Sequence, residues 1–127
     1  MNDFFRRTHD RILRKFLFHD VEFVLVGVHA AIYHGVERAT SDLDILVRPT
    51  YENGVKIIAS CKDLGLNVSG LAPEDFTTNN VFCFGMIPNG VDILNYSVGI
   101  SIDVIFENAV TSKIDGMRLK VIETYLR

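Results

Sequence analysis

Two carboxylates stand at the start of a short apolar segment. Asp42 and Asp44 are two residues apart, and residues 43–47 read Leu-Asp-Ile-Leu-Val, a pattern typical of a strand closed by Pro49. If residue 42 is already extended, both carboxylates project from one face, about 6.6 Å apart along the chain. Such charges beside an apolar run favour a hard divalent cation such as Mg²⁺ between them. The alternative is that both acids are solvated at a strand end.

A third acid, Asp92, lies in a second strand-like segment, residues 91–96. A small mixed sheet could place that strand beside the strand of Asp42 and Asp44. Three carboxylates could then hold metal ions that align an attacking hydroxyl, a phosphorus atom and a leaving pyrophosphate. Asp103 competes for this role, but it follows Ser101, a helix-capping residue, and has the position of a first-turn helix acid. We therefore expect Asp92 to be the third carboxylate.

The segment between the first two predicted strands has the features of a phosphate-binding loop. Gly27 follows residues 22–26, Glu-Phe-Val-Leu-Val, a predicted buried strand, and precedes a short predicted helix over 30–34. Backbone N–H groups at a helix N-terminus bind phosphate oxygens, and we expect His29 to lie near them. Arg38 either neutralises a nucleotide phosphate or is a solvated arginine ahead of a loop.

These residues together resemble the nucleotidyltransferase superfamily typified by DNA polymerase β. The similarity is greatest to small bacterial and archaeal members related to minimal nucleotidyltransferases and abortive-infection toxins. Their pattern is a hydrophobic strand, Gly-Gly or Gly-Ser, a helix, often His-Gly with a following Arg and Thr, then Asp-x-Asp and later a lone Asp. It is matched here, over about residues 20–122, by Gly27, His34-Gly35, Arg38, Thr40, Asp42, Asp44 and Asp92.

The resemblance implies a metal-dependent nucleotidyltransferase. Such an enzyme moves a nucleoside monophosphate from a nucleoside triphosphate to a hydroxyl of a protein, an RNA or a small molecule. The catalytic and metal-binding residues would be Asp42, Asp44 and Asp92, with Mg²⁺ or Mn²⁺ as cofactor. The nucleotide-binding residues would be Gly27, Val28, His29, Arg38, Thr40 and Ser41.

Two departures from the family pattern keep an alternative open. Val28 replaces the second glycine, and its side chain would crowd a triphosphate against the backbone. Relatives usually continue past the position of Arg127 into a helix with further nucleotide contacts. The alternative is a non-catalytic nucleotide-binding module or a toxin–antitoxin partner with the same fold. A sugar-nucleotide glycosyltransferase also uses Asp-x-Asp with a metal, but its nucleotide fold needs a longer chain.

The remaining pattern predicts the elements that must position these residues. A first helix, capped by Asp3, has apolar positions Ile12, Leu13, Phe16 and Leu17 at helical spacing. A second is expected over 51–64, with Gly54 weakening its first turn. Antiparallel strands are expected over 81–87 and 91–96 around Asn89-Gly90, and a last strand over 117–122. The class is α/β (α+β), a small mixed sheet flanked by helices.

Composition bounds the remaining possibilities. The chain has 127 residues, 48% of them hydrophobic, which predicts a single domain over 1–127. Its net charge of −3 argues against a broad face for duplex DNA, so any nucleic-acid contact would be local. Without an apolar run near the ~20 residues of a membrane span, we expect a cytoplasmic protein with no membrane contact. Cys61 and Cys83 are expected to be ordinary thiols.

Overall fold

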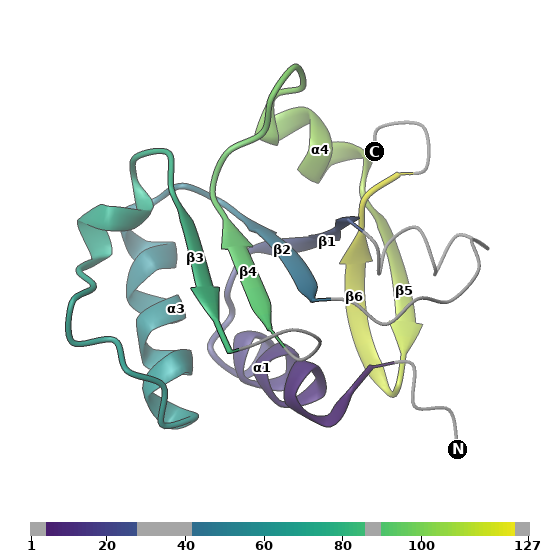
Figure 1. Cartoon of the computed structure of the whole chain (residues 1–127). Coiled ribbons are helices and arrows are strands. Elements are labelled where there is room, and N and C mark those ends of the chain that lie inside the picture. The colour runs from purple at the N-terminus through teal and green to yellow at the C-terminus, as the bar shows by residue number, and fades with distance from the viewer. Residues whose placement is uncertain (1–4, 28–41, 86–89, 124–127) are drawn as a thin grey trace.

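A six-stranded mixed sheet organises the chain in the computed structural model, which describes residues 5–27, 42–85 and 90–123 (Figure 1). The strand order is β3-β4-β2-β1-β6-β5. The strands are β1 (Phe23–Val26), β2 (Leu43–Val47), β3 (Val81–Phe84), β4 (Val91–Leu94), β5 (Val110–Ile114) and β6 (Met117–Val121). β2 runs parallel to β4 and β1 parallel to β6, while the other neighbours are antiparallel. The predicted class, a small mixed sheet with helices, is confirmed.

The described helices lie around this sheet. They are α1 (Arg7–Phe18), α3 (Tyr51–Asp63) and α4 (Ile102–Asn108), with a 3₁₀ turn η1 (Pro73–Phe76). α1 packs against α3, and α3 against η1. In Figure 1, α1 lies at the bottom of the view and α4 at the top. No helix within the described ranges is long and apolar enough to cross a membrane.

Every residue of β2 except Asp44 is buried, so both faces of this central strand are covered by other parts of the chain. Leu43, Ile45 and Val47 are fully buried, as expected for alternate residues of a strand packed on a core. Of the apolar positions predicted for the first helix, Leu17 is wrong, because it is 36% exposed whereas Phe16 is buried. Neighbouring helical residues point about 100° apart, so Leu17 can turn towards solvent while Phe16 faces the core.

The bounds of α1 and α3 correct two expectations. α1 begins at Arg7, and its cap residue Arg6 makes no side-chain cap hydrogen bond, while Asp3 lies outside the described residues. In α3, Gly54 is buried, and a Cβ there would lie 2.8 Å from the carbonyl oxygen of Pro73 and 3.0 Å from the Phe76 ring. The residue predicted only to weaken the helix therefore allows η1 to pack directly on it.

The predicted strands over 81–87 and 91–96 are present but end earlier in the structure than expected. β3 and β4 are antiparallel as expected, but they end at Phe84 and Leu94, and the predicted turn falls largely in residues 86–89, outside the described part. β5, which pairs antiparallel with β6, was not predicted. The sequence carried one signal for it, Asp115-Gly116, a dipeptide typical of hairpin turns, directly after residues 110–114.

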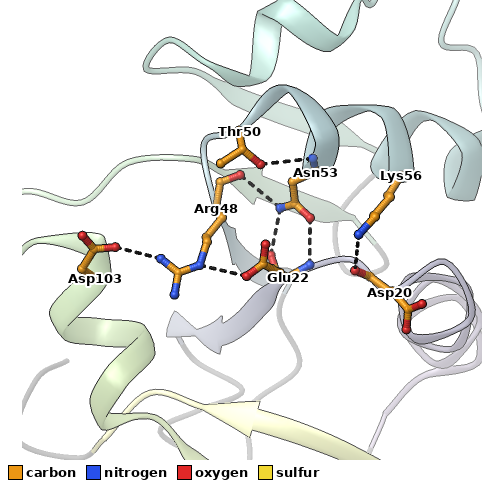
Figure 2. A network of polar contacts seen from close by, with 7 residues as sticks. All are labelled: Asp20, Glu22, Arg48, Thr50, Asn53, Lys56 and Asp103. Atoms are coloured by element: carbon orange, nitrogen blue, oxygen red, sulfur yellow. Dashed lines mark hydrogen bonds and ion pairs between the residues drawn. The ribbon is translucent and has the colours of Figure 1, made fainter.

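A polar network joins the end of β2 to α3, α4 and the start of β1 (Figure 2). The buried Asn53 side chain accepts a hydrogen bond from the Glu22 amide at 2.8 Å and donates to the carbonyls of Glu22 and Arg48, each at 3.0 Å. The Arg48 guanidinium pairs with Glu22 at 3.0 Å and Asp103 at 2.8 Å. It also lies 4.2 Å from the centre of the Phe106 ring. Around Arg48, opposite charges therefore meet at Glu22 and at Asp103.

Candidate active site

Two of the predicted carboxylates face one another across neighbouring strands. β2 and β4 are parallel, and their register places Asp44 directly opposite Asp92. The row continues with Val26 on β1 and Cys83 on β3. Residues paired in register project from the same face, so the two carboxylates share one face of the sheet. The topology thus joins residues 48 positions apart in the sequence.

The surroundings of Asp44 disfavour its charged form. Burial raises the pKa of Asp44 to about 6, with further contributions from the charge of Asp92, a hydrogen bond with Asp92 and the charge of Asp42. A hydrogen bond between two carboxyl groups requires a proton on one of them. Near neutral pH, where that proton is released, a positive charge beside the pair would relieve the repulsion between the two carboxylates.

Asp42 is held by the backbone that leads into β4. The Gly90 amide donates to Asp42 Oδ1 at 3.0 Å, and the Gly90 carbonyl accepts from the Leu43 amide at 2.9 Å. The buried His9 donates from Nε2 to the same carbonyl, 3.1 Å away. A Cβ on residue 90 would lie 2.9 Å from the Asp42 carboxylate. The sequence placed Gly90 only in a turn, and its contact with Asp42 was not predicted.

Gly27 has a comparable relation to Asp44. It follows β1 at a φ of +72°, in the left-handed region that favours glycine. A Cβ at this position would collide with Asp44 Oδ2. The absence of a side chain therefore lets the chain leaving β1 pass directly against this carboxylate, in addition to the phosphate-binding role that we predict for Gly27.

The comparisons with known proteins bear on this arrangement. A solved structure of a "putative nucleotidyltransferase" from Thermotoga maritima superposes with a TM-score of 0.59, at 16% sequence identity, over 95% of this chain and 81% of that one. The chain has a nucleotidyltransferase-like fold. At this identity the likeness concerns the fold alone. No protein-family model matches the sequence, and no curated protein matches it.

Cys83 is a neighbour of the acidic pair that spacing did not reveal. Its pKa is raised, first because the thiol hydrogen-bonds to Asp92 and also through its partial burial. The side chain is exposed at the edge strand β3. We interpreted it as an ordinary thiol because nothing in the sequence fixes the register that places residue 83 opposite residue 92.

Of the other candidate site residues, the structure describes Asp103 but not those of the predicted phosphate-binding loop. Asp103 lies in the first turn of α4, where Ser101 Oγ accepts a hydrogen bond from the Val104 amide at 3.2 Å. Its pairing with Arg48 confirms it as a helix acid outside the carboxylate row. The remaining predicted nucleotide-binding residues, Val28, His29, Arg38, Thr40 and Ser41, lie outside the described residues, as does the predicted helix over 30–34. The phosphate site stays a prediction.

The donor chemistry of the row fits a hard divalent cation. Asp42, Asp44 and Asp92 offer carboxylate oxygens, the ligands that Mg²⁺ prefers, and none forms an ion pair with a cationic side chain in the described ranges. As placed here, no three His, Cys, Asp or Glu side chains among the described residues form a group that could hold a metal ion. Asp44 and Asp92 are together, whereas Asp42 is held by Gly90.

Proposed function

We propose that this chain is a metal-dependent nucleotidyltransferase that transfers a nucleoside monophosphate from a nucleoside triphosphate to an acceptor hydroxyl. The observation that carries the proposal is the pairing of Asp44 with Asp92 on adjacent parallel strands, with Asp42 at the start of one of them. The nucleotidyltransferase-like fold supports it, because the chemistry expected of that fold needs clustered carboxylates.

The three carboxylates have distinct tasks in this proposal. Asp42, Asp44 and Asp92 would hold Mg²⁺ or Mn²⁺, which when bound supplies positive charge to the triphosphate and acidifies the acceptor hydroxyl. Asp44, with its pKa of about 6, would bind the metal in the deprotonated form that predominates near neutral pH. Asp92 accepts the proton of the acceptor hydroxyl. The acceptor oxygen forms a bond to the α-phosphorus, and the bond to the bridging oxygen breaks with release of pyrophosphate.

The triphosphate would lie along the chain that leaves β1. Gly27 lies against the Asp44 carboxylate, which supports binding of phosphates near this end of β1. We propose that Gly27, Val28, His29, Arg38, Thr40 and Ser41 bind the nucleotide. The basic and hydroxyl side chains among them have the chemistry that phosphate oxygens need.

The family resemblance extends the proposal to subtype, partner and compartment. We propose a minimal or abortive-infection-type nucleotidyltransferase of the cytoplasm, with a protein partner in a toxin–antitoxin pair. The cytoplasm is the compartment in which nucleoside triphosphates are abundant and free thiols such as Cys61 and Cys83 stay reduced.

A label-transfer assay tests the proposal. The purified protein is incubated with each α-³²P-labelled nucleoside triphosphate and Mg²⁺, and label is followed into RNA, protein and small-molecule acceptors while pyrophosphate release is measured. We expect transfer that EDTA abolishes. Asp44→Asn and Asp92→Asn should each reduce it at least about a hundredfold, because loss of a metal ligand should cost at least as much as loss of a group that only orients one.

Asp103→Asn is the matched control, because it removes an aspartate charge outside the carboxylate row. It should leave transfer within about twofold of the unmodified chain, since an exposed ion pair contributes little to structure. Triphosphate binding that depends on Mg²⁺ but gives no transfer with any acceptor would contradict the proposal in favour of the non-catalytic module. Transfer that survives Asp92→Asn would remove Asp92 from the site.

A further inference from the structure

A small groove opens between the start of β1 and the strand β6. It has a volume of about 190 Å³, and its apolar lining consists of Leu17, Val21, Phe23 and Phe106. A cavity of ~150 Å³ holds one benzene ring, so this groove has room for a single aromatic or branched aliphatic side chain. Its size therefore favours an anchoring side chain of a larger ligand.

The rest of the lining is charged. Arg118 and Lys120 of β6 line the groove together with Glu22, and both cations are exposed. Glu22 is already paired with Arg48 at 3.0 Å (Figure 2). By contrast, neither Arg118 nor Lys120 forms an ion pair with an acid in the part of the chain that the structure describes. Two positive charges at this groove are thus left for a ligand.

A third cation adds to the positive charge beside the groove. Lys113 of β5 lies directly opposite Arg118 in the ladder of β5 and β6, and both side chains are exposed. Like charges directly opposite each other on neighbouring strands are destabilising, so an anionic ligand would relieve this repulsion. We call Lys113, Arg118 and Lys120 the basic strip. It is a local positive surface on a chain with a net charge of −3, and it is complementary in charge to an acidic ligand.

The chemistry of the lining favours a protein over a nucleic acid. The four apolar side chains of the groove have no hydrogen-bonding atoms, and the carboxylate of Glu22 is held by Arg48. A nucleobase in the groove would bury polar atoms of its edge without partners, which costs free energy. The side chain of a Phe, Leu or Ile has no such atoms, and its burial is favourable.

We propose that the groove and the basic strip bind an acidic segment of a partner protein, with one aromatic or large aliphatic side chain in the groove and flanking carboxylates on the cations. The inference concerns an interaction surface and does not depend on the proposed transfer chemistry. Burial of the anchoring side chain would provide most of the affinity. The basic strip would attract and orient the acidic residues.

The copolymer poly(Glu,Tyr), with about four glutamates to each tyrosine, is a probe that carries both features. A Tyr ring can enter an open groove while its hydroxyl stays in water. Fluorescein-labelled copolymer is titrated with the full chain by fluorescence anisotropy at about 50 mM salt, where surface charges are weakly screened. We expect saturable binding at least about fivefold tighter than that of poly-Glu of the same charge, because only the copolymer has an anchor. Equal affinity for the two polymers would overturn the proposal.

Arg118→Gln/Lys120→Gln tests the cations of the groove. It should weaken binding of the copolymer by about tenfold or more, because it removes the charges that the carboxylates would contact. Arg7→Gln/Arg11→Gln is the matched control, since it removes two exposed arginines of α1 that are not part of the groove lining. This control should leave the affinity within about threefold. Equal losses in both variants would show a general attraction to positive charge and would overturn the site.

Leu17→Glu tests the apolar lining independently. Leu17 lines the groove, whereas its neighbour Phe18 is 75% exposed and is not part of the lining. The substitution places a negative charge at the groove and should weaken binding of the copolymer by about tenfold or more. Phe18→Glu adds the same charge one residue away, and its loss should be at least about threefold smaller. Equal losses in the two variants, both shown to be folded by circular dichroism, would contradict the groove.

Two other occupants are distinguished by the same variants. Tighter binding of a mixed-sequence single-stranded RNA than of the copolymer would overturn the proposal in favour of a nucleic acid. Self-association in sedimentation velocity that Arg118→Gln/Lys120→Gln abolishes would overturn it in favour of a second copy of this chain. All binding is measured without nucleoside triphosphate or metal. Loss of the copolymer site would therefore leave the proposed function standing, and a chain without transfer activity would leave this surface standing.

Discussion

Two polar clusters of this protein differ in the charges that they bring together. Around Arg48, the guanidinium lies between Glu22 and Asp103, so opposite charges meet. In the carboxylate row, Asp44 faces Asp92 with no described cation between them, and the pKa of Asp44 is raised to about 6. The first cluster is complete as it stands. In the second, repulsion between the carboxylates lowers the stability of the fold near neutral pH, and a bound cation would remove that repulsion.

The difference separates a structural cluster from a candidate active site. Complete networks stabilise a fold by satisfying buried groups, as Asn53 does for three backbone groups. Groups held in an unfavourable state, such as the paired carboxylates, are typical of sites where a ligand supplies what is missing. Changes in the two clusters should therefore differ in sign as well as in size.

Asn53→Ala should cause the largest loss of stability. It removes three hydrogen bonds of a buried side chain and leaves backbone groups of Glu22 and Arg48 without these partners. We expect the free energy of unfolding to fall by about 3 kcal/mol, measured by urea denaturation. Asn108→Ala is the control, because Asn108 is exposed and donates one bond to Val104, and it should cost about 0.5 kcal/mol or less. Equal losses in both variants would show that the network is not a stabilising centre.

Gly27→Ala should destabilise by about 2 kcal/mol, from strain at positive φ and from collision with the Asp44 carboxylate. Gly65→Ala separates the two causes. Gly65 has a similar φ of +76°, but a Cβ there meets nothing within 4 Å, so only the backbone strain applies, about 1 kcal/mol. Thermal unfolding of both variants measures the difference. If the two cost the same, the close approach of residue 27 to Asp44 contributes nothing.

Asp44→Asn should stabilise the metal-free protein above pH 6. Because the folded pKa is raised from 3.8 to about 6, the folded state retains a proton that the unfolded state has lost, and stability falls as pH rises through this window. The variant lacks this fall. Allowing for solvent screening of a half-buried pair, we expect a gain of about 1 kcal/mol at pH 7 and none at pH 3.5.

Melting curves with EDTA over pH 3.5–8 measure the stability gained by Asp44→Asn without metal. The same curves with Mg²⁺ and nucleotide test whether Asp44 binds the cation. Saturating Mg²⁺ with nucleotide should raise the melting temperature of the unmodified chain by several degrees and that of Asp44→Asn little. A variant that melts lower than the unmodified chain at pH 7 in EDTA would contradict the repulsion.

Asp103→Asn should have the smallest effect. It removes one partner of Arg48, but the Asp103 side chain is 82% exposed and Glu22 keeps its ion pair with the guanidinium. The melting temperature should fall by no more than about 2 °C, and the shift caused by Mg²⁺ with nucleotide should be unchanged. Loss of that shift would exchange the roles of Asp103 and Asp92.

Local pattern predicted most of the elements. Residues 43–47 were predicted as a strand and form β2, and Ser101 caps α4 as expected. These features depend on residues near one another in the sequence: apolar periodicity, Pro49 after the strand and a hydroxyl at the cap. β5 was missed because Thr-Ser-Lys at its centre are all polar, so this edge strand has no apolar alternation in the sequence.

For the candidate site too, the sequence indicated the residue types, whereas the contacts between them appeared only in the structure. The residue types Asp42, Asp44 and Asp92 indicated a cation-binding site, and the order of strands allowed Asp92 to lie beside Asp44. What the sequence could not give was the register between β2 and β4, since a shift of one residue would turn Asp92 to the other face. The contacts of Gly90 and Cys83 with the acids depend on the same register.

The sequence by itself determined the local conformations and the kind of chemistry, because helix caps, apolar periods and carboxylate spacing act over a few residues. Only the tertiary structure decided which side chains meet. It placed Asp44 against Asp92, Gly27 against Asp44, and Arg48 between Glu22 and Asp103. The physical reason is that strand register is fixed by the packing of the whole core face, with Leu43, Ile45 and Ile93 buried together.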